Sequence, residues 1–109
     1  MQVILLPEML EYLEDLAVTL YEKAYFSFEN TASEYVLDLY DDIVLNLPTR
    51  KHKPAPAYFD KYGKDMLYAT FRKNKQTTWY AFFTKHHQND DTVYLVRYIT
   101  NNHVVAQHL

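Results

Sequence analysis

The segment Met66-Leu-Tyr-Ala-Thr-Phe-Arg72 is the first of three that decide the fold. The second is Thr77-Thr-Trp-Tyr-Ala-Phe-Phe-Thr84, and the third is Thr92-Val-Tyr-Leu-Val-Arg-Tyr-Ile-Thr100. Aromatic and β-branched residues dominate all three, which is typical of strands with a half-buried surface. The polar breaks Lys73–Gln76 and Lys85–Asp91 are short enough for hairpins. The three strands are therefore expected to form an antiparallel meander.

Helical periodicity dominates the first half of the chain. Apolar residues recur at intervals near 3.6 from Glu8 onward, which predicts a helix over residues 8–25. Thr31 and Glu34 fit the capping box at the start of a second helix, and Pro48 ends that helix near residue 45 or 46. The residues expected to pack the two helices on the meander are Leu13, Leu16, Leu20, Val36, Leu39 and Ile43.

A short apolar run, Val3–Leu6, precedes Pro7 and predicts a further strand at the edge of the meander. The segment from Thr49 to Gly63 is expected to be a loop, in which this only glycine takes a turn conformation closed to other residues. The element order is then β-α-α-β-β-β. We expect one α+β domain over residues 1–109, with a helical hairpin packed on one face of a mainly antiparallel four-stranded sheet.

Charge is distributed unevenly along the chain, although the net charge is only −3. Residues 1–49 hold one basic and ten acidic residues, a net charge of −9. Residues 50–109 hold ten basic and four acidic residues, a net charge of +6. This division predicts an acidic helical face and a basic sheet face, and a basic face attracts polyanions. Ordinary solvated surface is the alternative interpretation.

The sequence contains neither a signal-peptide pattern nor a run of apolar residues long enough to span a membrane. It also contains no cysteine, which fits a reducing compartment and leaves no disulfide or thiolate metal site. We therefore expect a cytoplasmic protein with no membrane partner.

Several motifs of enzymatic sites are missing from the sequence. A single glycine excludes the glycine-rich phosphate loops, and the lack of cysteine excludes a thiol nucleophile. His86 and His87 are adjacent, so on a strand they would point to opposite sides. No carboxylate pattern accompanies the five histidines, and we expect neither a metal nor a cofactor.

Cationic and aromatic side chains suited to phosphates and bases are what remain. Simple alternation along the third strand places Arg97 with Val93, Leu95 and Ile99, and places Tyr98 on the other face. An arginine on a covered strand either pairs with an acid of a helix or points into a site, and both alternatives stay open. The whole set consists of Arg50, Lys51, Lys53, Arg72, Lys73, Lys75, Arg97, Tyr98 and His103.

The order of these segments resembles that of a known family. The resemblance rests on the opening strand Gln2–Leu6, the helical hairpin, the basic segment before Gly63, the strands Leu67–Arg72 and Trp79–Phe83, and the ending Tyr98-Ile-Thr-Asn-Asn-His103. Over nearly its full length the chain is similar to the RelE/ParE toxins of bacterial type II toxin–antitoxin modules. The β-α-α-β-β-β order is the fold that this family implies.

The resemblance implies two activities. RelE-like members cut mRNA in the ribosomal A site, and ParE-like members inhibit DNA gyrase without nuclease activity. The expected function is growth arrest by ribosome-dependent mRNA cleavage, with a cognate antitoxin protein as partner. The alternatives are a ParE-like inhibitor of gyrase and a catalytically degenerate member that only binds the antitoxin.

A RelE-like nuclease site would draw on both ends of the meander. The catalytic residues that the resemblance implies are Arg72, Arg97 and His103. The residues expected to bind the RNA are Arg50, Lys51, Lys53, Lys75 and Tyr98.

Overall fold

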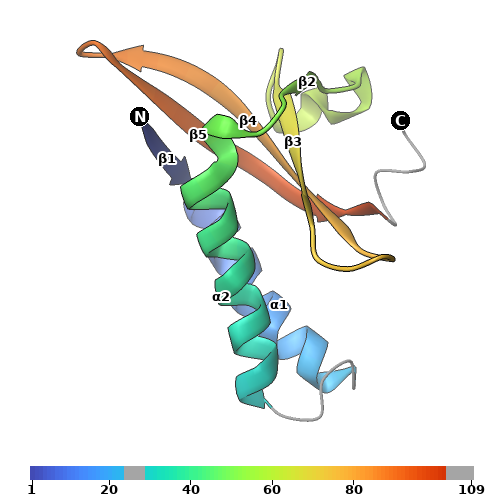
Figure 1. Ribbon diagram of the computed structural model, residues 1–109. Helices are drawn as coiled ribbons and strands as arrows, with labels where there is room; N and C mark the ends of the chain where they lie inside the picture. The colour runs from blue at the N-terminus through green and yellow to red at the C-terminus, as the bar shows by residue number, and fades with distance from the viewer. Residues whose placement is uncertain (24–28, 103–109) are drawn as a thin grey trace.

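The computed structural model describes residues 1–23 and 29–102 and has an α+β architecture with one mixed sheet and two packed helices (Figure 1). The elements in chain order are β1 (Gln2–Leu5), α1 (Pro7–Glu22), α2 (Glu29–Asn46), the 3-10 helix η1 (Leu47–Thr49), β2 (Lys53–Pro54), the 3-10 helix η2 (Ala57–Tyr62), β3 (Leu67–Arg72), β4 (Thr78–Gln88) and β5 (Asp91–Asn101). None of the helices in the described ranges is long and apolar enough to cross a membrane.

Among the described residues the sheet has five strands in the order β1-β5-β4-β3-β2, so the prediction of four strands was wrong. The meander of β3, β4 and β5 is antiparallel as predicted, and β1 joins its edge by pairing in parallel with β5. The extra strand is β2, in which Lys53 pairs with Tyr68 and Pro54 pairs with Leu67. A two-residue strand that contains proline leaves no periodic pattern in the sequence.

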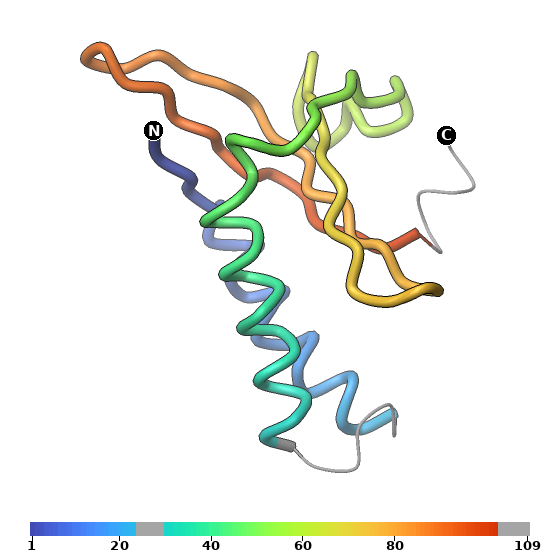
Figure 2. Tube along the Cα trace, viewed as in Figure 1, coloured from blue at the N-terminus to red at the C-terminus, as the bar shows by residue number. Residues whose placement is uncertain are grey.

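The β4–β5 hairpin is longer than predicted. The polar segment from Lys85 to Gln88 continues β4, and only Asn89 and Asp90 form the turn. Both turn residues have positive φ, 51° and 62°, as the tight turn that joins twisted strands requires. Asparagine and aspartate tolerate this conformation better than other residues that carry a Cβ. Figure 2 shows the hairpin extending beyond the other strands as a two-stranded ribbon.

Both helices pack on one face of the sheet, as the apolar stripes predict. Leu13, Val36, Leu39 and Ile43 are buried there together with Phe71, Trp79, Phe83, Val96 and Ile99 of the strands. Leu16 and Leu20 are partly buried against the same cluster. The side chain of Trp79 also donates a hydrogen bond from Nε1 to the hydroxyl of Tyr35 at 2.8 Å, which ties α2 to β4.

The helix boundaries correct two predictions. Pro7 starts α1 at the first helical position, where its missing N–H costs nothing, and the helix ends at Glu22 rather than near residue 25. Residues 24 and 25 lie outside the described ranges. Glu29 is already helical, so Thr31 lies within α2 and does not cap it. The end of α2 at Asn46, just before Pro48, agrees with the prediction.

The segment between the helices and the meander is more ordered than the predicted loop, because it contains η1, β2 and η2. Gly63 follows η2 with φ of 161° and ψ of 142°, which is extended backbone, so the expected turn conformation is wrong. Close packing explains the glycine instead. A Cβ at this position would lie 2.8 Å from Cδ of Arg97 and 3.2 Å from Sδ of Met66.

Candidate nucleic-acid interface

Of the described residues, those of η2 and its flanking segment cover part of the sheet face opposite the helices (Figure 1). At one part of this face, Phe59 of η2 stacks on Phe82 of β4 with ring centroids 4.4 Å apart. Met66 and Tyr68 complete that small buried cluster. We call the whole of this surface the open face, and by strand alternation it carries Tyr68, Thr70, Arg72, Thr78, Tyr80, Phe82, Thr84, Arg97, Tyr98 and Thr100.

A β-bulge brings Arg97 onto the open face beside Tyr98. Phe82 pairs with Tyr98 and Phe83 pairs with Val96, so Arg97 is the extra residue in β5. One additional residue shifts the alternation of side chains by one position. The predicted alternation, which put Arg97 and Tyr98 on opposite faces, was therefore wrong.

Arg97 is held by a hydroxyl rather than by an acid. Its Nε donates a hydrogen bond to Oγ1 of Thr84 at 3.1 Å, and its side chain is half-buried. The two ion pairs within residues 1–23 and 29–102 join the N-terminus to Asp91 and Arg50 to Asp42. Of the two alternatives for Arg97, the pairing with a helix acid is not what the structure has.

Thr84 also contacts His86, which was not among the predicted site residues. Thr84 Oγ1 and His86 Nε2 are 2.8 Å apart, two positions along the same side of β4. Because the hydroxyl accepts from Arg97, it can donate its own hydrogen to His86 when Nε2 carries no proton. The adjacent His87 contacts Thr92 instead, with 3.4 Å between Nδ1 and Oγ1. Adjacent histidines on one strand thus have different partners, and only His86 reaches the arginine through a hydroxyl.

Tyrosine side chains occupy the middle of the open face. Burial raises the pKa of Tyr98, and hydrogen bonding to Tyr62 raises it further. Burial likewise raises the pKa of Tyr80, with a further contribution from Tyr68, whose ring centroid is 5.7 Å away. These hydroxyls therefore stay protonated at neutral pH. They can donate hydrogen bonds, and their rings suit the stacking of unpaired bases.

The far end of the open face carries Arg72, whose side chain is exposed and whose Nε donates to the carbonyl oxygen of Asn74 at 3.1 Å. Lys75 lies in the same β3–β4 turn and is exposed. Asn102 closes this end, because its Oδ1 accepts from the backbone N–H of Thr78 and its Nδ2 donates to the carbonyl oxygen of Gln76. His103 follows directly in the chain and lies outside the described residues.

The structure does not bring Arg72 and Arg97 into one site. Arg72 pairs with Thr78, and Arg97 bonds to Thr84, six positions further along β4. At about 3.3 Å per residue, these positions are roughly 20 Å apart. The two arginines therefore mark opposite ends of the open face.

The other predicted RNA-binding residues divide between surfaces. Arg50 turns toward the helices, where it pairs with Asp42 at 3.2 Å and lies over the ring of Phe71. Lys51 and Lys53 are exposed, and Lys53 belongs to the edge strand β2. Tyr98 has one side of its ring occupied by Tyr62.

Comparisons with known proteins do not indicate what the open face binds. No protein-family model matches the chain, and neither a curated protein nor a solved structure matches it. The function must therefore be argued from the geometry of the open face.

Proposed function

We propose that the chain is a growth-arresting toxin of the RelE/ParE type that binds and cleaves mRNA on the ribosome through its open face. The element order and the helical hairpin on one face of the sheet support this proposal. The arrangement of tyrosines between two arginines supports it as well, since bases stack on aromatic rings and arginine grips phosphates.

The observation that carries the proposal is the link from Arg97 through the Thr84 hydroxyl to His86. In RNA cleavage, a base removes the proton of a 2′-hydroxyl, whose oxygen then attacks the adjacent phosphorus. Imidazole is suited to this proton transfer near neutral pH, and Nε2 of His86 would accept the 2′-hydroxyl proton in place of the hydrogen bond from Thr84. Arg97 would stabilise the negative charge that develops on the phosphate. The products would be a 2′,3′-cyclic phosphate and a 5′-hydroxyl, with the leaving 5′-oxygen taking up a proton from water.

The rest of the open face would position the RNA. Tyr80 lies between the two arginines and is half-buried, so part of its ring is accessible to a base. Arg72 and Lys75 would hold the backbone of a strand that runs from the Arg97 end of the face. Phosphate contacts of this kind fix register and orientation rather than perform chemistry.

The test is inducible expression of the chain without any antitoxin in a bacterial host, with growth, mRNA cleavage and DNA supercoiling measured in one culture. We expect growth arrest together with mRNA cleavage, and we expect His86→Ala to lower the cleavage rate by about 10²–10⁴-fold. His87→Ala is the matched control, because this neighbouring imidazole contacts Thr92 instead of Thr84. Equal losses in the two variants would refute a specific role for His86.

A second candidate function is a ParE-like, non-enzymatic block of DNA gyrase. It is favoured by the separation of Arg72 and Arg97, because these two catalytic residues that the resemblance implies lie at opposite ends of the open face. Growth arrest with loss of supercoiling and intact mRNA would assign the chain to this function. Absence of growth arrest would leave the third alternative, a member that only binds an antitoxin.

A cognate antitoxin is the protein partner that the toxin proposal implies. β2 covers only the Leu67 and Tyr68 end of β3, so the rest of that strand offers an edge to which an extended segment could pair. An acidic segment would also find the exposed Lys53 and Arg72 near this edge. Its affinity should fall as the salt concentration rises, because the screening length is only about 10 Å at 0.1 M.

A further inference from the structure

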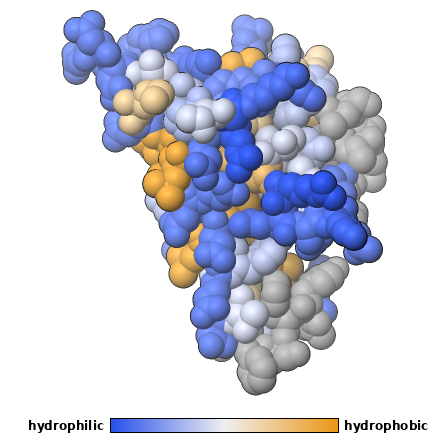
Figure 3. Space-filling model, in the orientation of Figure 1, coloured by the Kyte–Doolittle hydropathy of each residue, from blue (hydrophilic) through white to orange (hydrophobic). Residues whose placement is uncertain are grey.

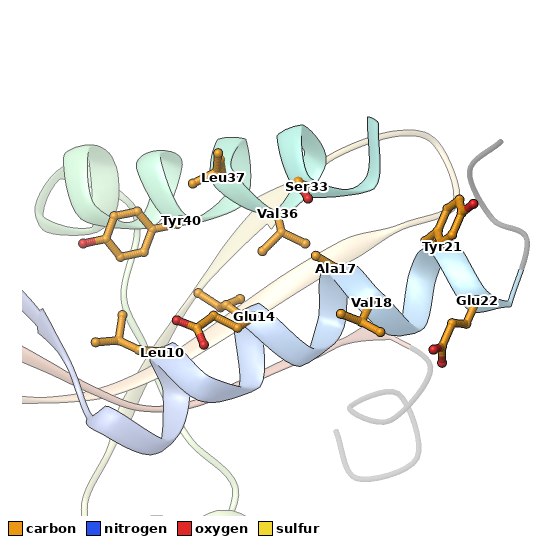
Figure 4. Close-up of a pocket in the computed structure, with 11 residues that line it drawn as sticks. Leu10, Glu14, Ala17, Val18, Tyr21, Glu22, Ser33, Val36, Leu37 and Tyr40 are labelled. Carbon is orange, nitrogen blue, oxygen red and sulfur yellow. The ribbon is translucent and has the colours of Figure 1, made fainter. Parts of the chain in front are cut away.

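The helical hairpin has a second apolar surface that the sheet does not use. A groove of about 680 Å³ runs between α1 and α2 and is lined by residues from both helices (Figure 4). Its exposed apolar residues are Leu10, Val18, Tyr21 and Leu37, with exposed fractions of 43%, 52%, 42% and 59%. Figure 3 shows hydrophobic residues at the surface of the helical part, among hydrophilic ones. A run of large apolar side chains on one surface marks an interaction site more often than scattered ones do.

The negative charge of the two helices restricts the kind of partner that this groove can bind. The two helices contain ten acidic residues and no lysine or arginine, and Glu14 and Glu22 line the groove itself. A second copy that docked through the same surface would bring acids against acids, since a twofold interface pairs a patch with itself. A partner with basic residues beside an apolar stripe would satisfy both features of the groove.

The length of the groove restricts the partner further. The groove extends along α1 from Leu10 to Glu22, which corresponds to roughly 18 Å at about 1.5 Å per residue. A helix of about three turns fits this length and would place apolar residues at positions i, i+3 or i+4, and i+7. We propose that the α1–α2 groove is a docking site for an amphipathic helix of another protein, with lysine or arginine flanking its apolar stripe. The site lies on the opposite side of the sheet from the open face, so it does not depend on the RNA proposal.

The test uses a displayed library of amphipathic helices of about four turns, in which the positions flanking the apolar stripe are randomised among basic, acidic and neutral residues. Selection against the full chain should enrich helices with basic flanks. Leu37→Ser and Val18→Ser should each weaken the selected helices by about tenfold or more. Leu45→Ser is the matched control for Leu37→Ser, because Leu45 is also in α2, is 73% exposed and does not line the groove.

Two further variants test the acidic residues that line the groove. Glu14→Gln and Glu22→Gln should reduce both the affinity and its dependence on salt, whereas Glu8→Gln on the same helix should change neither. All substituted residues are exposed, so equal melting temperatures would confirm that each variant is folded. Enrichment of acidic or neutral flanks, or no enrichment, would overturn the proposal. A chain that sediments as a dimer, and becomes a monomer on Leu37→Ser, would overturn it in favour of a second copy.

Discussion

The ring of Tyr62 lies on the ring of Tyr98 with centroids 3.8 Å apart and an interplanar angle of 6°. This stack joins η2 to β5, and Phe59 joins η2 to β4 through Phe82. The segment that covers part of the open face is therefore anchored by two aromatic pairs. Because Tyr62 occupies one side of the Tyr98 ring, a base can reach that ring only from another direction or after Tyr62 moves.

The Tyr62–Tyr98 stack should contribute measurably to stability. Tyr62→Ala is expected to lower the free energy of unfolding by about 1–3 kcal/mol, from lost burial and from the 0.5–1.5 kcal/mol that an aromatic pair adds. Tyr62→Phe keeps the ring and should lose about 1 kcal/mol or less, the contribution of a hydroxyl. Urea melts of both variants measure the difference. Equal effects of the two substitutions would show that the stack itself contributes little.

Tyr12 of α1 should make stability fall in alkaline solution. Burial raises its pKa from 10.0 to about 12, with a smaller contribution from Tyr98. The unfolded chain therefore loses this proton first, so the stabilisation is complete below pH 10.0 and is lost as the pH rises toward about 12. Partial solvent contact limits the loss to the order of 1–2 kcal/mol. Urea melts from neutral pH to about pH 11 should show a shallower decline for Tyr12→Phe than for the unchanged chain.

Leu39 should be among the most sensitive positions of the core. It is fully buried between α2 and the sheet, so Leu39→Ala is expected to lower the free energy of unfolding by about 2–5 kcal/mol. Leu45→Ala is the matched substitution at an exposed position of the same helix and should change it by less than about 0.5 kcal/mol. Denaturant melts that placed both variants within the smaller value would contradict the assignment of the buried face.

The helices and the meander could be predicted because their patterns are periodic. Leu39 and Ile43 recur at the helical interval, and both are fully buried, so one sheet face was assigned correctly. The ends were less predictable. The polar residues Lys85 to Gln88 resemble a loop, yet their backbone pairs with β5 and their side chains extend into solvent. The ladder of backbone hydrogen bonds, which side-chain composition does not encode, continues the strand there.

The candidate site was less predictable than the fold, because a bulge leaves no signature in side-chain type. Arg97 and Tyr98 share the open face because β5 contains one extra residue at the bulge. Alternation alone would assign them to opposite faces. The contact between Thr84 and His86 follows from the extension of β4 to Gln88, beyond Thr84, where the aromatic and β-branched pattern ends. Asn89-Asp90 was the available signal, because this pair suits a two-residue hairpin turn.

Gly63 and Arg97 should be energetically coupled. The methyl group added in Gly63→Ala would lie 2.8 Å from Cδ of Arg97, and the arginine is held in place by Thr84. The substitution is expected to cost about 1–3 kcal/mol through overpacking. Arg97→Ala removes the clash, so the double variant should be more stable than the sum of the single effects predicts, by about 0.5–3 kcal/mol. Additive effects in denaturant melts would show that Met66, 3.2 Å from the added methyl, is the decisive neighbour.

Measurements of RNA binding should distinguish the cationic residues of the open face from its tyrosines. Arg72 and Lys75 are exposed cations, so Arg72→Ala and Lys75→Ala should each weaken binding of single-stranded RNA oligonucleotides, whatever their sequence. Each should also reduce the slope of log affinity against log salt by about 0.7, the value for one phosphate contact on a single strand. Fluorescence anisotropy over a series of salt concentrations measures both quantities.

Tyr80 should act through stacking instead of charge. Tyr80→Ala is expected to weaken RNA binding by about 1–3 kcal/mol while the salt slope stays unchanged, because stacking of a base on a ring involves no release of counterions. Arg50→Ala is the control for the cations, since Arg50 already pairs with Asp42 on the helical side and should alter neither affinity nor slope. If Arg50→Ala matched Arg72→Ala, the RNA would follow the net basic charge of residues 50–109 rather than the open face. Because the Arg72 and Lys75 variants should change both affinity and slope, Tyr80→Ala only the affinity and Arg50→Ala neither, the same titrations separate a defined interface from general electrostatic attraction.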